Sequence, residues 1–230
     1  MRKFVSTAIL LGAAINANAT LVEGTFTGVV YGVSISAETP KDVGDFLVGD
    51  SVTGTFCYDT KYLVPIVPIE LSSTSGEWQS TGAPAAAVLS ATIDRRTYTV
   101  KGEASSSLYI DADESGRSNP GNRFYLSASA NYGVGSRVAR GVSTGSISIV
   151  VANNSLGSPY LSNITDPGTV SFTNQSLPAS SGEGSAISII NRSGAGVAAI
   201  NFAITDASAH AVSIDEPFIH MHCPREMREK

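Results

Sequence analysis

The sequence predicts an all-β protein, an antiparallel β-sandwich or jelly-roll-like domain of about ten short strands. Three observations support this class. Apolar and polar residues alternate along many short segments, as in strands with one buried face. Turn residues such as Gly, Pro, Asn, Asp and Ser separate these segments, and no stretch keeps the period of a helix. Charged residues make up only 15% of the chain and glycine occurs 22 times, a composition that favours strands and tight turns.

The N-terminal residues 1–19 predict an export signal that precedes the fold. Arg2 and Lys3 form a positive start, residues 4–14 are an apolar run, and Ala17-Asn18-Ala19 is a small-x-small cleavage site. An uncleaved membrane anchor is the alternative, but the run is shorter than the roughly 20 apolar residues that cross a bilayer. We therefore expect cleavage after Ala19 and a mature protein that is secreted, periplasmic or held at the cell surface.

The charge of the chain bears on its partners. Loss of Arg2 and Lys3 with the signal would take the formal net charge from −5 to −7. An acidic exported protein is a poor partner for nucleic acid or for an anionic membrane, so neither is expected. No later stretch is long and apolar enough to span a membrane. We predict one β-sandwich domain over residues 20–214, followed by a flexible tail at 215–230.

The first half of the chain predicts four strands and two loops. Residues 62–71 are apolar, but Pro65 and Pro68 exclude a central strand, so they are predicted to be an extended loop. Residues 72–85 are predicted to be a polar loop. The strands are predicted over 23–37, with apolar residues on both faces as in a central strand, 46–58, 86–93 and 97–100, the last two joined as a hairpin at Asp94-Arg95.

The second half continues the pattern to the tail. A polar loop at 111–123 separates two strands that are predicted to pair. The segment VSTGSISIVV at 142–151 is rich in β-branched residues and predicts a strong strand. The predicted strands are 107–110, 124–128, 142–151, 170–172, 182–190, 196–205 and 211–214.

Two cysteines, Cys57 and Cys223, remain after the predicted cleavage. In the strand around Cys57, the alternation places Phe56 and Tyr58 on the buried face and Cys57 on the outer face, within reach of the tail. In an exported protein an even pair of cysteines is a candidate disulfide. Two unpaired thiols are the alternative, because sequence does not show the Cα separation that a disulfide needs.

With these segments in view, the chain resembles the exported β-rich bacterial proteins that commonly carry a PEP-CTERM sorting tail. The segment GDSVTGTFCYDT at 49–60 is similar to their recurrent G-x-x-V-x-G-x-F-x-Y-D-T pattern, and GTFTGVVYG at 24–32 and the strand-and-loop pattern after residue 146 also match. The resemblance implies export and association with the surface or extracellular matrix, and no shared catalytic residues. Asp215-Glu216-Pro217 stands where the sorting motif would begin, but no apolar helix follows, so sorting and anchoring are not carried over.

Trp78, the only tryptophan, is a candidate ligand-binding residue. An exposed indole could stack on a sugar ring. The alternative, which we favour, is that a single tryptophan in a β domain closes the core.

Asp111, Asp113 and Ser115, followed by Gly116, resemble the start of a calcium loop with oxygen ligands at alternate positions. Position 12 of such a loop is Asn122, which lacks the bidentate carboxylate. A solvated acidic loop is therefore the favoured interpretation, and calcium is the only cofactor for which the sequence offers a candidate site.

The tail offers soft metal ligands in His220, His222 and Cys223, with His210 upstream. A flexible tail is a poor preformed metal site, so we do not expect metal binding there. All three histidines lie within the last 21 residues, which leaves no histidine base for a nucleophile in the body of the chain. The segment GVSTG at 141–145 resembles a nucleophile elbow but begins a strand instead of ending one.

The sequence therefore predicts a secreted, non-catalytic β-sandwich protein of the cell surface or extracellular matrix that binds polysaccharide weakly. The alternative is an exported hydrolase acting on glycans or esters, since a β-sandwich serves both classes and carboxylate pairs are set by the fold.

Overall fold

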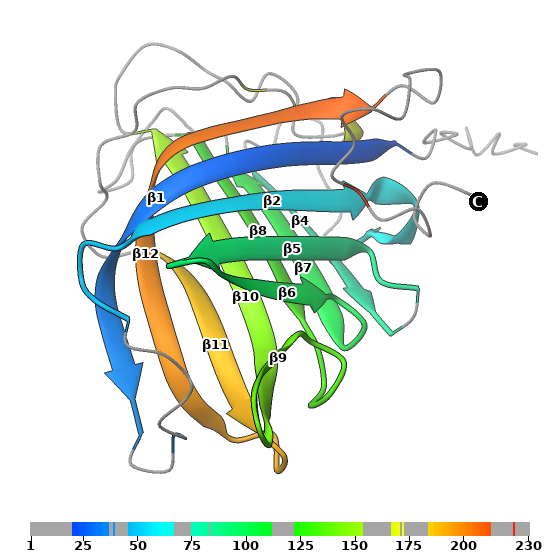
Figure 1. The fold of residues 1–230 in the computed structure, drawn as a ribbon. Helices are drawn as coiled ribbons and strands as arrows, with labels where there is room; N and C mark the ends of the chain where they lie inside the picture. The colour runs from blue at the N-terminus through cyan, green and yellow to red at the C-terminus, as the bar shows by residue number, and fades with distance from the viewer. Residues whose placement is uncertain are drawn as a thin grey trace, which may run out of the picture.

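The computed structural model describes residues 20–36, 39, 46–66, 75–82, 84–111, 122–153, 167–170, 172, 184–212 and 223, and it is built almost entirely from strands (Figure 1). The two helical elements of the described part are single 3-10 turns. The elements are β1 (Leu21–Ile35), β2 (Ser51–Asp59), η2 (Thr60–Tyr62), β3 (Val64–Pro65), β4 (Ser75–Thr81), β5 (Ala87–Ile93), β6 (Arg96–Lys101), β7 (Ser105–Asp111), β8 (Asn122–Ser129), β9 (Arg137–Ala139), β10 (Val142–Asn153), η3 (Pro167–Thr169), β11 (Ser185–Asn191) and β12 (Gly196–Val212).

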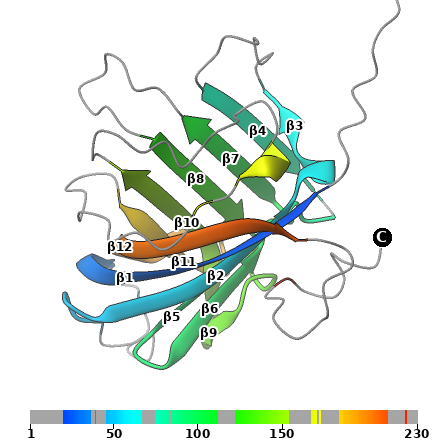
Figure 2. The same cartoon turned by 90° about the horizontal axis from the view of Figure 1, so that it is seen from above.

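The twelve strands form one sheet in the order β3-β4-β7-β8-β10-β11-β12-β1-β2-β5-β6, with β9 beside β10. Every pairing is antiparallel. The predicted all-β antiparallel class is therefore confirmed. Seen from above, β4, β7, β8 and β10 lie on one side and β1, β2, β5 and β6 on the other (Figure 2).

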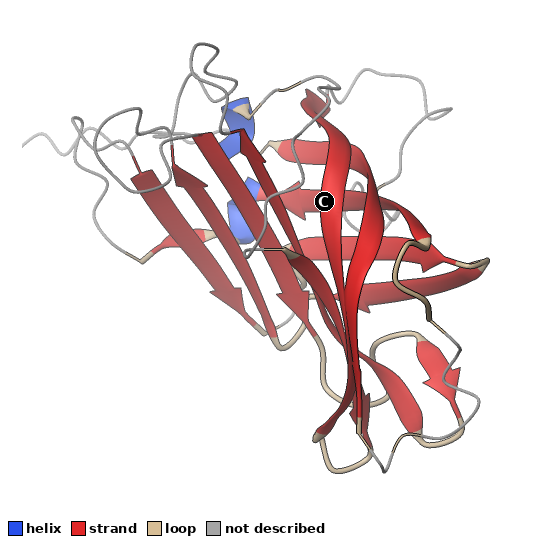
Figure 3. Ribbon diagram, turned by 90° about the vertical axis from the view of Figure 1, so that its left-hand side faces the viewer, coloured by secondary structure: helices blue, strands red, loops and turns tan. Residues whose placement is uncertain are grey.

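The sheet is curled into a half-barrel, where the sequence predicted a sandwich of two sheets (Figure 3). Two long strands, β1 and β12, pair along their whole length and carry register shifts between Thr27 and Gly28 and between Val30 and Gly32. Such β-bulges bend a strand and increase its twist. One sheet thus covers both sides of the core, because its longest strands turn the corner without leaving the sheet.

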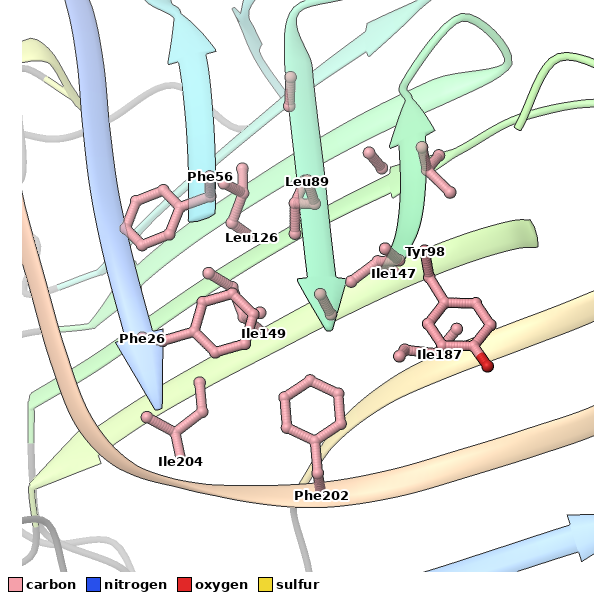
Figure 4. Close-up of a cluster of buried hydrophobic side chains, with 14 of the residues drawn as sticks. Phe26, Phe56, Leu89, Tyr98, Leu126, Ile147, Ile149, Ile187, Phe202 and Ile204 are labelled. Atoms are coloured by element: carbon pink, nitrogen blue, oxygen red, sulfur yellow. The ribbon is translucent and has the colours of Figure 1, made fainter. Parts of the chain in front are cut away.

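The concave side of the half-barrel holds the core, since alternate residues of every strand point inward. Phe26 stacks on Phe202 with ring centroids 5.8 Å apart, and Phe124 lies 5.5 Å from both Phe56 and Phe172. Figure 4 shows Phe26, Phe56 and Phe202 beside aliphatic side chains of β5, β8, β10, β11 and β12. Aromatic rings from distant parts of the chain therefore join the two sides of the sheet.

A repeated Gly-Thr-Phe sequence sets the centre of the β1–β2 pair. Gly24 lies directly opposite Phe56, and Phe26 lies opposite Gly54. A Cβ added at Gly24 would overlap the Phe56 ring, and a Cβ added at Gly54 would overlap the Phe26 ring. Each phenylalanine thus fills the space above the glycine of the neighbouring strand, which explains why both glycines stand in strand interiors.

Ser136 covers part of one edge of the sheet. In the edge strand β6, the Thr99 carbonyl accepts a hydrogen bond from the Ser136 N–H (2.9 Å), and the Thr99 N–H donates one to Ser136 Oγ (2.9 Å). Ser136 also contacts β10, because its hydroxyl lies 2.9 Å from Thr144 Oγ1. An unpaired edge is a site for unwanted strand pairing, and here part of it is covered.

Four predicted segments differ in detail from the structure. At 170–172, predicted to be a strand, Phe172 makes an isolated bridge to Ala209 of β12. Residues 72–85, predicted to be a loop, contain strand β4. Of its inward-facing residues Gly76 and Trp78, only Trp78 has an apolar side chain, so the sequence shows no clear alternation there. The strands predicted at 196–205 and 211–214 are one continuous strand, β12. Within 62–71, Val64–Pro65 forms the short edge strand β3. No helix in the described ranges is long and apolar enough to cross a membrane.

Candidate functional site

A groove of about 370 Å³ lies on the convex face of the sheet, across β4, β7, β8 and β10. Four of its lining residues form a row at right angles to the strands. Glu77 is directly opposite Tyr109, Tyr109 is opposite Tyr125, and Tyr125 is opposite Val150. Their sequence neighbours, among them Leu108 and Phe124, point to the core. The groove is lined by Glu77, Ser107, Tyr109, Arg123, Tyr125, Val150 and Gly184.

Tyr109 and Tyr125 form the central part of this groove. Residues directly opposite each other in an antiparallel pair have Cβ atoms roughly 5 Å apart, so the two phenol rings are close neighbours. Both side chains are half-buried, which leaves part of each ring open to the groove. A tyrosine combines an apolar ring with a polar hydroxyl, as a sugar-binding surface requires.

Two charged residues stand beside the tyrosines. Arg123 lies two residues before Tyr125 on the same face of β8, and Glu77 lies at the β4 end of the row. The described lining thus has one cation, one anion, the Ser107 hydroxyl and the two tyrosine hydroxyls as hydrogen-bonding groups. This composition suits a neutral, hydroxyl-rich ligand more than a strongly charged one.

The lining contains one described carboxylate, that of Glu77. Most glycosidases need two carboxyl groups on either side of the bond that they cleave. Among the described lining residues, Glu77 is the one that could take a carboxyl role of this kind.

A second hollow of about 390 Å³ lies at the β3 edge of the sheet. Its walls include Tyr62, Val64, Ile66 and Gln79, and both Val64 and Ile66 are exposed. No described charged residue lines it. Its hydrogen-bonding groups are the neutral side chains of Tyr62, Gln79, Ser80 and Thr81, and it has one aromatic ring where the groove on β7 and β8 has two.

Trp78, the candidate sugar-stacking residue, lies in the core. Its side chain is 3% exposed and its ring covers Gly76 of the same strand. The indole therefore has no face open to a sugar, and its position corresponds to the core-closing interpretation. The aromatic residues on the opposite face of the same region are Tyr109 and Tyr125.

The candidate calcium loop falls mostly outside the described residues. Asp111 is the last residue of β7, whereas Asp113 and Ser115 lie in the segment that the structure does not describe. Among the described residues, no group of three or more His, Cys, Asp or Glu side chains is placed to hold a metal ion.

Cys57 and Cys223 form a disulfide, with Cα atoms 5.4 Å apart. Cys57 lies on the outer face of β2, opposite Glu23 of β1, and yet is only 1% exposed. The outer face is therefore covered at the disulfide, where Cys223 is also buried. Glu23 is also buried there, with its Oε1 3.4 Å from Nε2 of the exposed His210. Because Cys223 is bonded, its sulfur is not available as a thiolate metal ligand.

Two ionisable groups outside the groove have shifted pKa values. Burial raises the pKa of Asp59 above its usual value near 3.8, against the opposing effects of a hydrogen bond from the Lys61 N–H and of the Lys61 charge. Burial also raises the pKa of Tyr98 to about 12, against the opposing charge of Arg96. Neither residue lines the groove, so both shifts concern stability.

Sequence reasoning did not identify Glu77, Tyr109, Arg123 and Tyr125 as a group. One signal was present, because Tyr109 and Tyr125 occupy outward positions of two strands that were predicted to pair. Whether the two tyrosines lie directly opposite each other depends on the register of β7 and β8. The length of the loop between these strands does not determine that register.

Comparison of the chain with protein-family models, curated proteins and solved structures gives no match, so the groove itself carries the argument about function.

Proposed function

We propose that this protein is exported, is not an enzyme, and binds polysaccharide weakly at the cell surface or in the extracellular matrix through the groove on β4, β7, β8 and β10. The observation that supports this proposal is the row Glu77–Tyr109–Tyr125–Val150, which presents two adjacent phenol rings with polar groups beside them. Export is supported by the N-terminal signal pattern, and the surface location by the resemblance of segment 49–60.

Weak binding is expected from the shape of the groove. It lies on the outer face of a sheet, so it contacts one side of a ligand and leaves the other side in water. Affinity then comes from ring stacking and a few hydrogen bonds, each of which replaces a hydrogen bond to water and adds little net free energy. Proteins of a surface or matrix gain strength by repeating such weak contacts along a polymer.

A glycan-array screen of residues 20–230, with and without calcium, tests the proposal. We expect saturable binding to a polysaccharide without turnover. The variant Tyr125→Ala should bind roughly tenfold more weakly, as loss of one stacked ring removes on the order of 1 kcal/mol. Binding that is lost with a chelator and restored by calcium would show that calcium takes part in binding.

Tyr132→Ala is the matched control, because Tyr132 is a partly exposed tyrosine in the turn after β8 and does not line the groove. This variant should bind as the unchanged protein does. Hydrolysis of a glycan or ester, abolished by Glu77→Gln, would establish the alternative function as a hydrolase.

A further inference from the structure

Tyr31, on β1, lies apart from the groove in the sequence and in the strand order, yet it is aimed toward it. Val30 pairs with Phe202 of β12 and Gly32 pairs with Asn201, so Tyr31 is the extra residue of a β-bulge and has no partner on β12. Bulges commonly re-aim a side chain next to a functional site. The Tyr31 side chain is 46% exposed, which is unusual for a large aromatic residue in a central strand.

The hydroxyl end of Tyr31 lies against Gly184, because a Cβ added at Gly184 would overlap the Tyr31 hydroxyl and ring. Gly184 precedes β11, and β12 lies between β11 and β1. The ring of Tyr31 therefore leans across β12. Only a glycine leaves room for it at position 184.

Gly184 is also a lining residue of the groove. Its neighbour Ser185 accepts a hydrogen bond from the Val150 N–H at Oγ (2.9 Å), which places this corner of β11 beside β10. The row of outward residues thus continues from Glu77, Tyr109, Tyr125 and Val150 through Gly184 to Tyr31.

We propose that the groove is one end of a longer binding track, that its ligand is an unbranched polysaccharide lying across the strands, and that Tyr31 binds the sugar at the far end. This inference rests on the proposed function, because it extends the same surface. The track crosses β4, β7, β8, β10 and β11 in the order of the sheet and ends over β12, where the Tyr31 ring of β1 leans toward Gly184.

The strand spacing sets the length of the ligand. Neighbouring strands lie about 4.8 Å apart, so the five intervals from β4 to β12, over which the Tyr31 ring leans, span about 24 Å. The four intervals from β4 to β11 span about 19 Å. With one sugar of an extended chain taken as about one strand interval, the groove alone accommodates about four sugars, and the track with Tyr31 accommodates about five.

The test measures affinity against chain length. Cello-, manno- and chito-oligosaccharides from disaccharide to octasaccharide are titrated into residues 20–230 by calorimetry. For the unchanged protein, affinity should rise up to about the pentasaccharide and then level off. Tyr31→Ala should bind the hexasaccharide roughly tenfold more weakly and the tetrasaccharide as tightly as before.

Three further variants separate the outcomes. Tyr31→Phe should keep the affinity for the hexasaccharide, because it keeps the ring. Tyr125→Ala should weaken binding at every length, and Tyr132→Ala at none. Thermal melting of each variant confirms that the fold is intact.

Equal loss of affinity for tetrasaccharide and hexasaccharide in Tyr31→Ala, or no loss for either, would overturn the extended track while the proposed function stands. If the unchanged protein binds none of the three series and no polysaccharide of the array, both the track and the proposed function are wrong.

Discussion

Reduction of the Cys57–Cys223 disulfide should destabilise the protein strongly. The bond joins residues 166 positions apart, so it closes a loop that includes most of the described chain. In the chain-entropy treatment of a cross-link, a loop of this length restricts the unfolded chain by about 5 kcal/mol at 25 °C. Small and medium domains unfold with roughly 5–15 kcal/mol, so the bond accounts for a large share of the total.

The location of the bond adds a second contribution. Cys57 and Glu23 are both buried on the outer face of β2 and β1, and Cys57 is bonded there to the buried Cys223. When the bond is reduced and Cys223 moves away, Cys57 becomes exposed to water. The loss of Cys57 burial should add to the entropic effect.

Urea unfolding of oxidised and reduced protein, followed by far-ultraviolet circular dichroism, measures the difference. We expect the free energy of unfolding to fall by up to about 5 kcal/mol in the presence of a phosphine reductant. The double variant Cys57→Ala/Cys223→Ala is the control and should unfold at the same urea concentration with and without reductant. Two titratable thiols in the oxidised, unfolded protein, or equal stabilities of the oxidised and reduced forms, would refute the reasoning.

Three further predictions concern the core and its ionisable groups. Gly54→Ala should lower the free energy of unfolding by about 1–3 kcal/mol, because the added Cβ would overlap the Phe26 ring and the Ser90 carbonyl oxygen. Gly196→Ala is the control: its Cβ would meet open space, so the same urea titration should show no loss of stability. Tyr98→Phe should leave stability unchanged or raise it by about 1 kcal/mol, since the buried hydroxyl has no hydrogen-bond partner among the described residues; a large loss in thermal melting would contradict this. Asp59→Asn keeps the Oδ1 acceptor for the Lys61 N–H but removes the charge. Because the pKa of Asp59 is higher in the folded than in the unfolded protein, the free energy of unfolding should fall as pH rises from about 3.8 through the raised pKa. Urea titrations between pH 3 and 7 should show a smaller fall for Asp59→Asn than for the unchanged protein.

The alternation of buried and outward-facing residues within single strands could be predicted from the sequence. Val52, Phe56 and Tyr58 are all buried on the concave side, as their shared parity in segment 48–60 indicates. Cys57 takes the opposite face and meets Cys223 there. These features depend on neighbours along the chain, which is why they could be read from it.

The missed features depend on contacts between distant strands. Strand β4 has one large inward residue, Trp78, so its alternation is too weak to distinguish it from a loop. The curl of the sheet accompanies two bulges in the β1–β12 pair, at Thr205 of β12 and at Tyr31 of β1, which exist only because β12 pairs with β1 in a particular register. The Tyr109–Tyr125 pair likewise exists only once the register of β7 and β8 is set.

The pairing of β1 with β12 determines when folding can finish. The first strand of the sheet has the last strand as its neighbour, with Leu21 opposite Val212. Contacts between residues so distant in sequence slow folding, because the chain loses the entropy of a long loop before it gains them. During synthesis, β1 can pair with β2 on one side, but its other side stays open until β12, near the end of the chain, has emerged. The edge of β1 that faces β12 is therefore the part of the sheet that stays unpaired longest while the chain is being made.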